Sequence, residues 1–176
     1  VERELHRALA NGELRMHLQP QVDAAGRCVG AEALVRWEHP TRGLVAPSHF
    51  IPVAEKDNFI VELGRWVLHD ACRVLAKLNT NASTSELSIA VNVSPRQFLQ
   101  PAFVTEVRDL LQATGAAPSR LKLELTESIF ARDIEDIARK MAALRELGVS
   151  FSLDDFGTGY SCLAYLKKLP FDQIKI

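Results

Sequence analysis

Two adjacent carboxylates, Asp154 and Asp155, end the apolar run VSFSL, and a loop with two glycines follows them. Strands disfavour Asp, and neighbouring carboxylates repel each other. Single polar residues interrupt or end other apolar runs in the same way: Glu32 in GAEALVRW, Asn92 in LSIAVNVS, Glu124 in LKLELTE and Lys175 in FDQIKI. The chain therefore carries oxygen donors and a lysine close to where its strands are expected to end.

Repulsion among these acids limits what the site can be. Two unit charges about 4 Å apart repel by roughly 4 kcal/mol at an effective dielectric of about 20, which is a large fraction of the stability of a typical domain. Lys175 and Arg36 are too few to neutralise four gathered carboxylates. A bound divalent cation is the simpler way to offset the repulsion.

The donor types indicate which cation. The set consists of carboxylates and the amide oxygen of Asn92, without His or Cys, and such hard ligands suit Mg²⁺ or Mn²⁺. Because Asp154 and Asp155 are adjacent, they can serve two ions about 3.5–4 Å apart, with Asp154 as the bridging ligand. Sites of this kind clamp the attacking and leaving oxygens in the hydrolysis of phosphoesters.

Each of these residues also has an ordinary structural interpretation. An acid at the end of a strand is commonly a helix cap, so Asp155 could cap the turn into a helix at 160–168, and Asn92 could cap the helix that follows Pro95. Glu127 could be an acid in the first turn of a helix. The recurrence of oxygen ligands at the end of strand after strand favours the metal site.

The elements that must position these residues follow from hydrophobic spacing and turn residues. The turn residues at 23–26 separate two strand-like runs and predict a hairpin. Beyond the hairpin, strands and helices alternate, which predicts a parallel sheet with crossover helices. We expect helices over 2–14, 61–78, 95–114, 133–147 and 160–168, and strands over 87–94, 121–127, 149–153 and 171–176.

Two α/β architectures fit this alternation, an open doubly wound sheet and a closed barrel. The GxGxxG turn of a dinucleotide-binding sheet is absent from the sequence. In a (β/α)8 barrel the carboxyl ends of all strands converge on one face, where the polar residues would meet. The strands are mostly apolar, as expected when both of their faces are covered. The sequence therefore favours the barrel.

Composition excludes several function classes. The 176 residues carry a net charge of −1, so no broad basic field favours a DNA or RNA polymer as ligand. The apolar runs are too short to span a bilayer, and we expect a cytoplasmic domain whose parent protein can be membrane-anchored. The chain begins with Val1 and reads as part of a longer polypeptide.

Five motifs in order resemble the EAL domain family of bacterial phosphodiesterases, which hydrolyse cyclic di-GMP. They are AEALVRW, NVS, ELTE, DDFGTGYS and LPFDQIKI, and the match runs from about residue 14 to residue 176. The resemblance implies one domain over 1–176, with a leading helix at 1–13 and a modified TIM (β/α)8-like barrel from about 14 that has one antiparallel strand. It also implies that the barrel is incomplete at the C-terminus, because the family continues with further strands, helices and site residues.

The resemblance implies roles for individual residues. Glu32, Asn92, Glu124 and Asp154 resemble the ligands of a first metal, and Asp154 and Asp155 those of a second. Lys175 resembles a lysine that orients the attacking water. Other roles implied by the family are substrate binding by Gln19, Leu34 and Arg36. The family also implies a loop that links the metal site to dimer contacts, which includes Phe156, Gly157, Thr158 and Gly159 and is held in place by Glu127.

The function implied is the metal-dependent hydrolysis of cyclic di-GMP to linear pGpG, with Glu32, Asp154 and Lys175 in catalytic roles. The alternative is an inactive EAL domain that acts as a cyclic di-GMP receptor or scaffold. A homodimer is expected, as is a sensory or GGDEF-type domain elsewhere in the parent chain.

Overall fold

A computed structural model describes residues 2–155, 157 and 166–175 of the chain. Its α-helices are α1 (Glu2–Ala10), α2 (Pro47–Lys56), α3 (Phe59–Asn79), α4 (Pro95–Phe98), α5 (Phe103–Thr114) and α6 (Ile134–Glu146). Its strands are β1 (Leu14–Val22), β2 (Cys28–His39), β3 (Gly43–Val45), β4 (Ser88–Asn92), β5 (Leu121–Thr126), β6 (Ser150–Asp154) and β7 (Gln173–Ile174). Short 3₁₀ helices precede β5 (Pro118–Arg120) and follow it (Glu127–Ala131).

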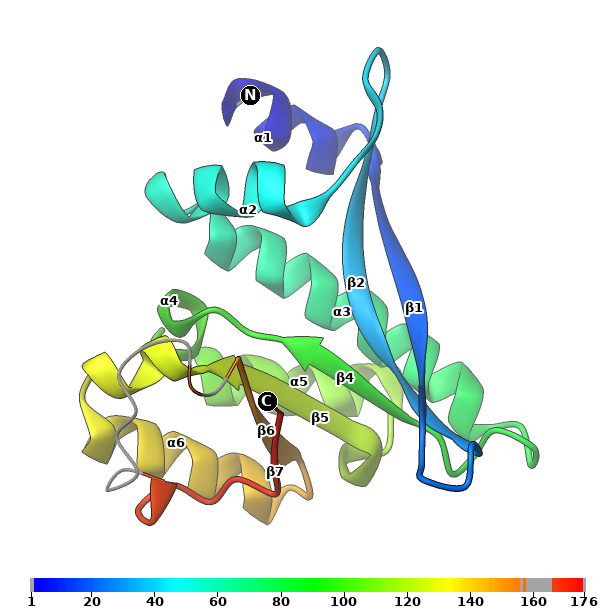
Figure 1. Cartoon of the computed structure of the whole chain (residues 1–176), viewed down its shortest axis with the longest axis vertical. Coiled ribbons are helices and arrows are strands. Elements are labelled where there is room, and N and C mark those ends of the chain that lie inside the picture. The colour runs from blue at the N-terminus through cyan, green and yellow to red at the C-terminus, as the bar shows by residue number, and fades with distance from the viewer. Residues whose placement is uncertain (1, 156, 158–165, 176) are drawn as a thin grey trace.

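The strands form one mixed sheet in the order β1-β2-β4-β5-β6-β7, and β3 pairs with β2. Strand β2 is antiparallel to β1 and to β3. Strands β2, β4, β5, β6 and β7 run parallel to one another. The predicted α/β class and the antiparallel hairpin are therefore confirmed. Within the described residues the sheet is open, because β1 and β7 are its edges, and Figure 1 shows the long β1–β2 hairpin on one side.

The two faces of the parallel strands differ in chemistry. Side chains alternate between faces along a strand, and one face of β4–β6 carries fully buried apolar residues: Ile89, Val91, Leu121, Leu123, Leu125, Phe151 and Leu153. The opposite face carries small or polar side chains in the same strands. In the middle of the sheet this face is buried as well, because Ala90, Glu124 and Ser152 are each at most 1% exposed. We call it the polar face.

Helices pack along the sheet and supply the rest of the core. Helix α3 contacts β1, β2 and β4, and α6 contacts β6, so the crossover connections lie where the sequence predicts them (Figure 1). Each of these two helices places an apolar stripe in the core, from Leu63 to Leu75 in α3 and from Ile137 to Leu144 in α6. None of the described helices is long and apolar enough to cross a membrane.

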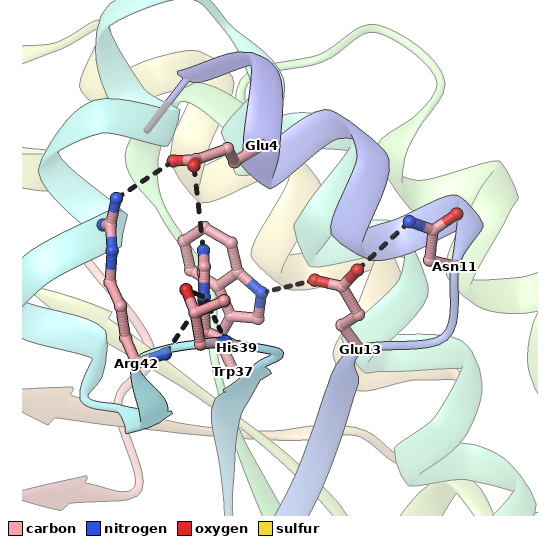
Figure 2. A network of polar contacts seen from close by, with 7 residues as sticks. Glu4, Asn11, Glu13, Trp37, His39 and Arg42 are labelled. Atoms are coloured by element: carbon pink, nitrogen blue, oxygen red, sulfur yellow. Dashed lines mark hydrogen bonds and ion pairs between the residues drawn. The ribbon is translucent and has the colours of Figure 1, made fainter.

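A polar network fastens α1 to the end of the hairpin (Figure 2). The Trp37 Nε1–H donates to Glu13 Oε2 at 3.0 Å, and the Arg42 guanidinium donates to Glu4 Oε2 at 3.3 Å. The imidazole of His39 lies 3.8 Å from the other oxygen of Glu4. Helix α1 is therefore held to β2 by side-chain contacts as well as by its buried residues Leu5 and Ala8.

Several predicted boundaries were wrong. The first helix ends at Ala10, because Gly12 takes a positive φ of 65° that ends the turn before β1. The helix expected over 95–114 is two helices, α4 and α5, with Pro101 between them. Helix α2 is absent from the sequence prediction, and it contains Pro52 in its interior. Most of the helix expected over 160–168 lies outside the described residues.

Asp172 ties the segment before β7 to β6. Its two carboxylate oxygens each lie 2.7 Å from Arg145 Nη1, and Oδ2 accepts the Phe151 N–H at 2.8 Å. Burial alone would raise the pKa of Asp172, but the Arg145 and Phe151 donors outweigh burial and hold the pKa below its usual range. A carboxyl with a lowered folded pKa stabilises the fold above its unfolded pKa of about 4, and this contribution is lost as the pH falls through the folded pKa.

We therefore expect Asp172→Asn to lower the free energy of unfolding by about 1 kcal/mol at pH 7, since the pair is partly exposed. The loss should become smaller as the pH approaches about 3, because the wild-type carboxyl then begins to protonate. Urea denaturation at several pH values measures both effects. The matched control is Asp109→Asn, which removes an exposed acid beside Arg108. An effect of Asp172→Asn that does not change with pH would contradict the prediction.

Candidate active site

The pairing of the strands places the sequence-predicted polar residues on the polar face. Glu32 pairs with Ala90, Asn92 with Glu124, and Thr126 with Asp154. Because residues two apart along a strand share a face, these pairs line up Glu32, Asn92, Glu124 and Asp154. Lys175 belongs to the same row, two residues after Gln173, which pairs with Ser152. The sheet thus gathers on one face residues that are up to 143 positions apart, from Glu32 to Lys175.

Three carboxylates form a compact cluster. Glu32, Glu124 and Asp154 each offer an oxygen, and these oxygens lie within 4.8 Å of one another. Glu124 is the deepest member, with 1% of its surface exposed, whereas 20% of the Glu32 side chain is exposed. Burial raises the pKa of Glu124, and the charges of Glu32 and Asp154 add to this, while Lys175 opposes it.

The side chains of Lys175 and Asn92 contact this cluster. The Lys175 ammonium lies 2.5 Å from Glu124 Oε1 and 3.5 Å from Glu32 Oε2. The Asn92 Nδ2–H donates to Glu32 Oε1 at 2.7 Å. Burial by itself would lower the pKa of Lys175, but the hydrogen bond to Glu124 and the surrounding acids raise it above its usual range. The ammonium therefore carries its charge in the middle of the acids.

The donors present fit a hard divalent cation. The second oxygen of Glu124, Oε2, is buried and has no hydrogen-bond partner among the described residues. A buried carboxylate oxygen without a donor is costly, and a cation held jointly with Glu32 and Asp154 would satisfy it. The cluster of acids can thus hold a metal ion, and its all-oxygen composition agrees with the ligand set expected from the sequence.

Asn92 does not cap the following helix. Ser94 is the N-cap of α4, and its side chain accepts the Gln97 N–H at 3.1 Å. The interpretation of Asn92 as a helix cap is therefore wrong. Its amide faces Glu32 instead, across the sheet.

Asp155 follows Asp154 directly after the end of β6. Among the residues that the structure describes, it is not a member of the carboxylate group. It is exposed, its φ of 55° is left-handed, and its backbone N–H donates to Asp154 Oδ1 at 3.1 Å. The backbone thus leaves the extended conformation of β6 at Asp155.

Glu127 connects β5 to the loop after β6. It is buried at the start of the 3₁₀ helix Glu127–Ala131, and its Oε2 accepts the Gly157 N–H at 3.3 Å. The structure therefore brings Glu127 into contact with Gly157, one residue of the loop that the family resemblance implies Glu127 holds. Phe156, Thr158 and Gly159 lie outside the described residues, and so does most of the helix that Asp155 was expected to cap.

The residues expected to bind substrate lie beside the cluster on the hairpin. Gln19 of β1 is directly opposite Glu32 of β2, so both side chains emerge on the same face. Leu34 and Arg36 follow Glu32 on that face at two and four residues. The Arg36 Nη1–H donates to the backbone oxygen of Val35 at 2.9 Å.

A cavity of about 290 Å³ opens next to the cluster. It is lined by Leu34, Asn92 and Glu124, and also by residues of α2, α3 and α4 that sequence reasoning missed. The most telling of these is Gln97, which is 2% exposed and whose Nε2 has no hydrogen-bond partner among the described residues. In the sequence, Gln97 is marked only as a polar residue on the inward side of a short helix.

Comparison with known proteins then settles the family. The family model described as the EAL domain matches residues 2–176. The chain belongs to the EAL domain family. Among its relatives are two proteins of Pseudomonas aeruginosa. The bifunctional diguanylate cyclase/cyclic di-GMP phosphodiesterase MucR is 45% identical over 174 residues, which cover 98% of this chain and 25% of MucR. The cyclic di-GMP phosphodiesterase NbdA is 45% identical over 177 residues, which cover 100% of this chain and 22% of NbdA.

A solved structure of an EAL relative has the same fold. The PaMucR phosphodiesterase in a c-di-GMP complex matches with a TM-score of 0.92 and 44% identity, over 99% of this chain and 70% of that chain. This EAL domain thus has the TIM-barrel-like arrangement of its family over the described residues, with the sheet open. It spans about a quarter or less of the length of the curated relatives named above.

Proposed function

We propose that this EAL domain hydrolyses cyclic di-GMP to linear pGpG in a reaction that depends on Mg²⁺ or Mn²⁺. The observation that carries the proposal is the gathering of Glu32, Glu124 and Asp154 oxygens within 4.8 Å of one another, from strands β2, β5 and β6. The relatives named as cyclic di-GMP phosphodiesterases and the neighbour in a c-di-GMP complex support the choice of substrate.

We assign the first metal to Glu32, Asn92, Glu124 and Asp154, and a second to Asp154 with Asp155. Ions held by these residues would activate a water and neutralise the charge that develops on the phosphate oxygens. Asn92 can offer its carbonyl oxygen once its amide turns from Glu32. Asp155 follows Asp154 directly, and Glu127 accepts the Gly157 N–H two residues further on.

The remaining residues bind and orient the substrate. Arg36 has a planar guanidinium that suits two oxygens of a phosphate, and Gln19 and Leu34 are beside it on the polar face. Lys175 would hold the attacking water in line with the scissile bond, because its ammonium already lies between the acids of the cluster. Closure of the sheet around this face would exclude bulk water and strengthen these charge interactions.

The domain would act within a longer signalling protein. MucR carries two activities in its name, which supports a sensory or GGDEF-type domain in the parent chain. We also propose that the protein works as a homodimer and that its ligand is the cyclic dinucleotide rather than a polymer of DNA or RNA.

Incubation of the full-length protein with cyclic di-GMP tests the proposal. With Mg²⁺ or Mn²⁺ we expect linear pGpG in chromatography, and removal of the metal by EDTA should lower the rate by about a hundredfold or more. Excess Mn²⁺ should restore the rate. Tight binding of cyclic di-GMP in calorimetry without any product over long incubation would contradict hydrolysis and favour the receptor alternative.

A further inference from the structure

The Lys175 ammonium occupies the position of a cation within the acid cluster. It contacts one oxygen of Glu124 at 2.5 Å and one of Glu32 at 3.5 Å. These two residues are also members of the carboxylate group whose oxygens converge. The charged amine thus offsets the repulsion that otherwise opposes burial of Glu124.

A metal ion and this ammonium would compete for the same oxygens. A Mg²⁺ or Mn²⁺ ion binds carboxylate oxygen at about 2.0–2.2 Å, which is closer than an ammonium can approach. Two like charges that share Glu124 and Glu32 repel each other strongly where water is excluded. The geometry therefore makes simultaneous occupation of both oxygens by Lys175 and a metal unfavourable.

Lys175 directly follows β7, the short strand at the edge of the described sheet. Strand β7 has only two residues, pairs with β6 alone within the described residues, and leaves Ile174 44% exposed. The Lys175 N–H donates to the backbone oxygen of Leu153 at 2.8 Å. The side chain has room to withdraw, since 23% of it is exposed.

We infer that Lys175 is a built-in substitute cation, which holds the acid cluster together before metal binds and is displaced from Glu124 and Glu32 when metal enters. This inference rests on the proposed function, because it assumes that the cluster is the metal site. It adds that occupancy of the site and the position of Lys175 are coupled, so that the lysine becomes available to orient water only after the metal has replaced it.

Metal titration of variants of the full-length protein tests the competition. We expect Lys175→Met to bind the first Mn²⁺ about tenfold more tightly than wild type in electron paramagnetic resonance, because no ammonium has to leave. The matched control is Lys122→Met. Lys122 lies on the same face and donates to Gln173 Oε1 at 2.9 Å, so this variant removes an equal charge away from the cluster. Its Mn²⁺ affinity should change far less.

A second measurement follows the lysine directly. Reductive methylation read by peptide mass spectrometry should modify Lys175 several times faster with saturating Mn²⁺ than without metal, while Lys122 keeps its rate. Lys175→Met should also lower the melting temperature of the metal-free protein, and Mn²⁺ should raise that temperature more than it does in wild type.

The results of these experiments distinguish the displacement of Lys175 from the proposed hydrolysis of cyclic di-GMP. If wild type binds Mn²⁺ and hydrolyses cyclic di-GMP, but Lys175→Met binds Mn²⁺ no more tightly and Lys175 labelling ignores the metal, the displacement is wrong and the proposed function stands. If neither protein binds Mn²⁺, both are overturned.

Discussion

Replacing Glu124 by glutamine should lower the rate of cyclic di-GMP hydrolysis by about a thousandfold or more. Glu124 is the most buried acid of the cluster, and its Oε2 has no hydrogen-bond partner among the described residues. Glutamine keeps the shape of the side chain but removes the charge that would bind metal. Rates at saturating Mn²⁺ and circular dichroism of the purified variant provide the measurement.

Glu86→Gln is the matched control for this change. Glu86 pairs with Arg120 beyond the opposite end of the strands and is largely exposed, so the same chemical substitution should leave the rate unchanged. If Glu124→Gln folds normally and retains full activity, the assignment of the metal site to this cluster is wrong.

Phe151→Ala should cost about 3–5 kcal/mol of the free energy of unfolding. The ring is fully buried on the apolar face of β6 and lies edge-on to Phe98, with centroids 6.2 Å apart. Its backbone also exchanges hydrogen bonds with Asp172, so the strand that ends at Asp154 depends on it. Because a domain is stable by only about 5–15 kcal/mol, urea denaturation should show a large shift of the midpoint.

Phe171→Ala offers a comparison at a site that is only partly buried, and its cost should be smaller. Phe151→Leu keeps most of the volume and should cost about 1–1.5 kcal/mol. Equal midpoints for Phe151→Ala and Phe171→Ala would contradict the view that the apolar face of β6 is the centre of the core.

The sequence predicts β1, β2, β4, β5 and β6 well because their signals are local, whereas β3 was missed and the strand expected over 171–176 is only Gln173–Ile174. The turn residues from Asp23 to Gly26 mark the hairpin, and the Asp23 side chain does accept the Ala25 and Arg27 N–H groups there. Apolar spacing locates α3 and α6 to within a few residues. The convergence of Glu32, Glu124 and Asp154 also follows from the parallel order of the strands, which the alternation of elements indicates.

Other features depend on contacts that no local pattern reports. Helix α2 was missed because Pro52 removes a helical donor and weakens the periodic signal. The contact between Asn92 and Glu32 joins residues 60 apart, and the position of Lys175 between two acids joins residues up to 143 apart. The sequence shows that Lys175 and Arg36 carry too little positive charge to neutralise the acids. It does not show that the Lys175 ammonium contacts both Glu124 and Glu32. The left-handed φ of Asp155 is a further such feature, because the residue type does not predict it.

The alternation of side chains in β4, β5 and β6 restricts how the length of this domain can vary. An insertion or deletion of a single residue inside β5 would exchange the faces on which its side chains lie. Glu124 would move to the apolar face, and Leu123 or Leu125 would move to the polar face among the acids. Folding and chemistry would fail together, with no intermediate that keeps one of them. Tolerated changes in length should therefore be confined to exposed connections such as residues 80–86, which lie outside the strands.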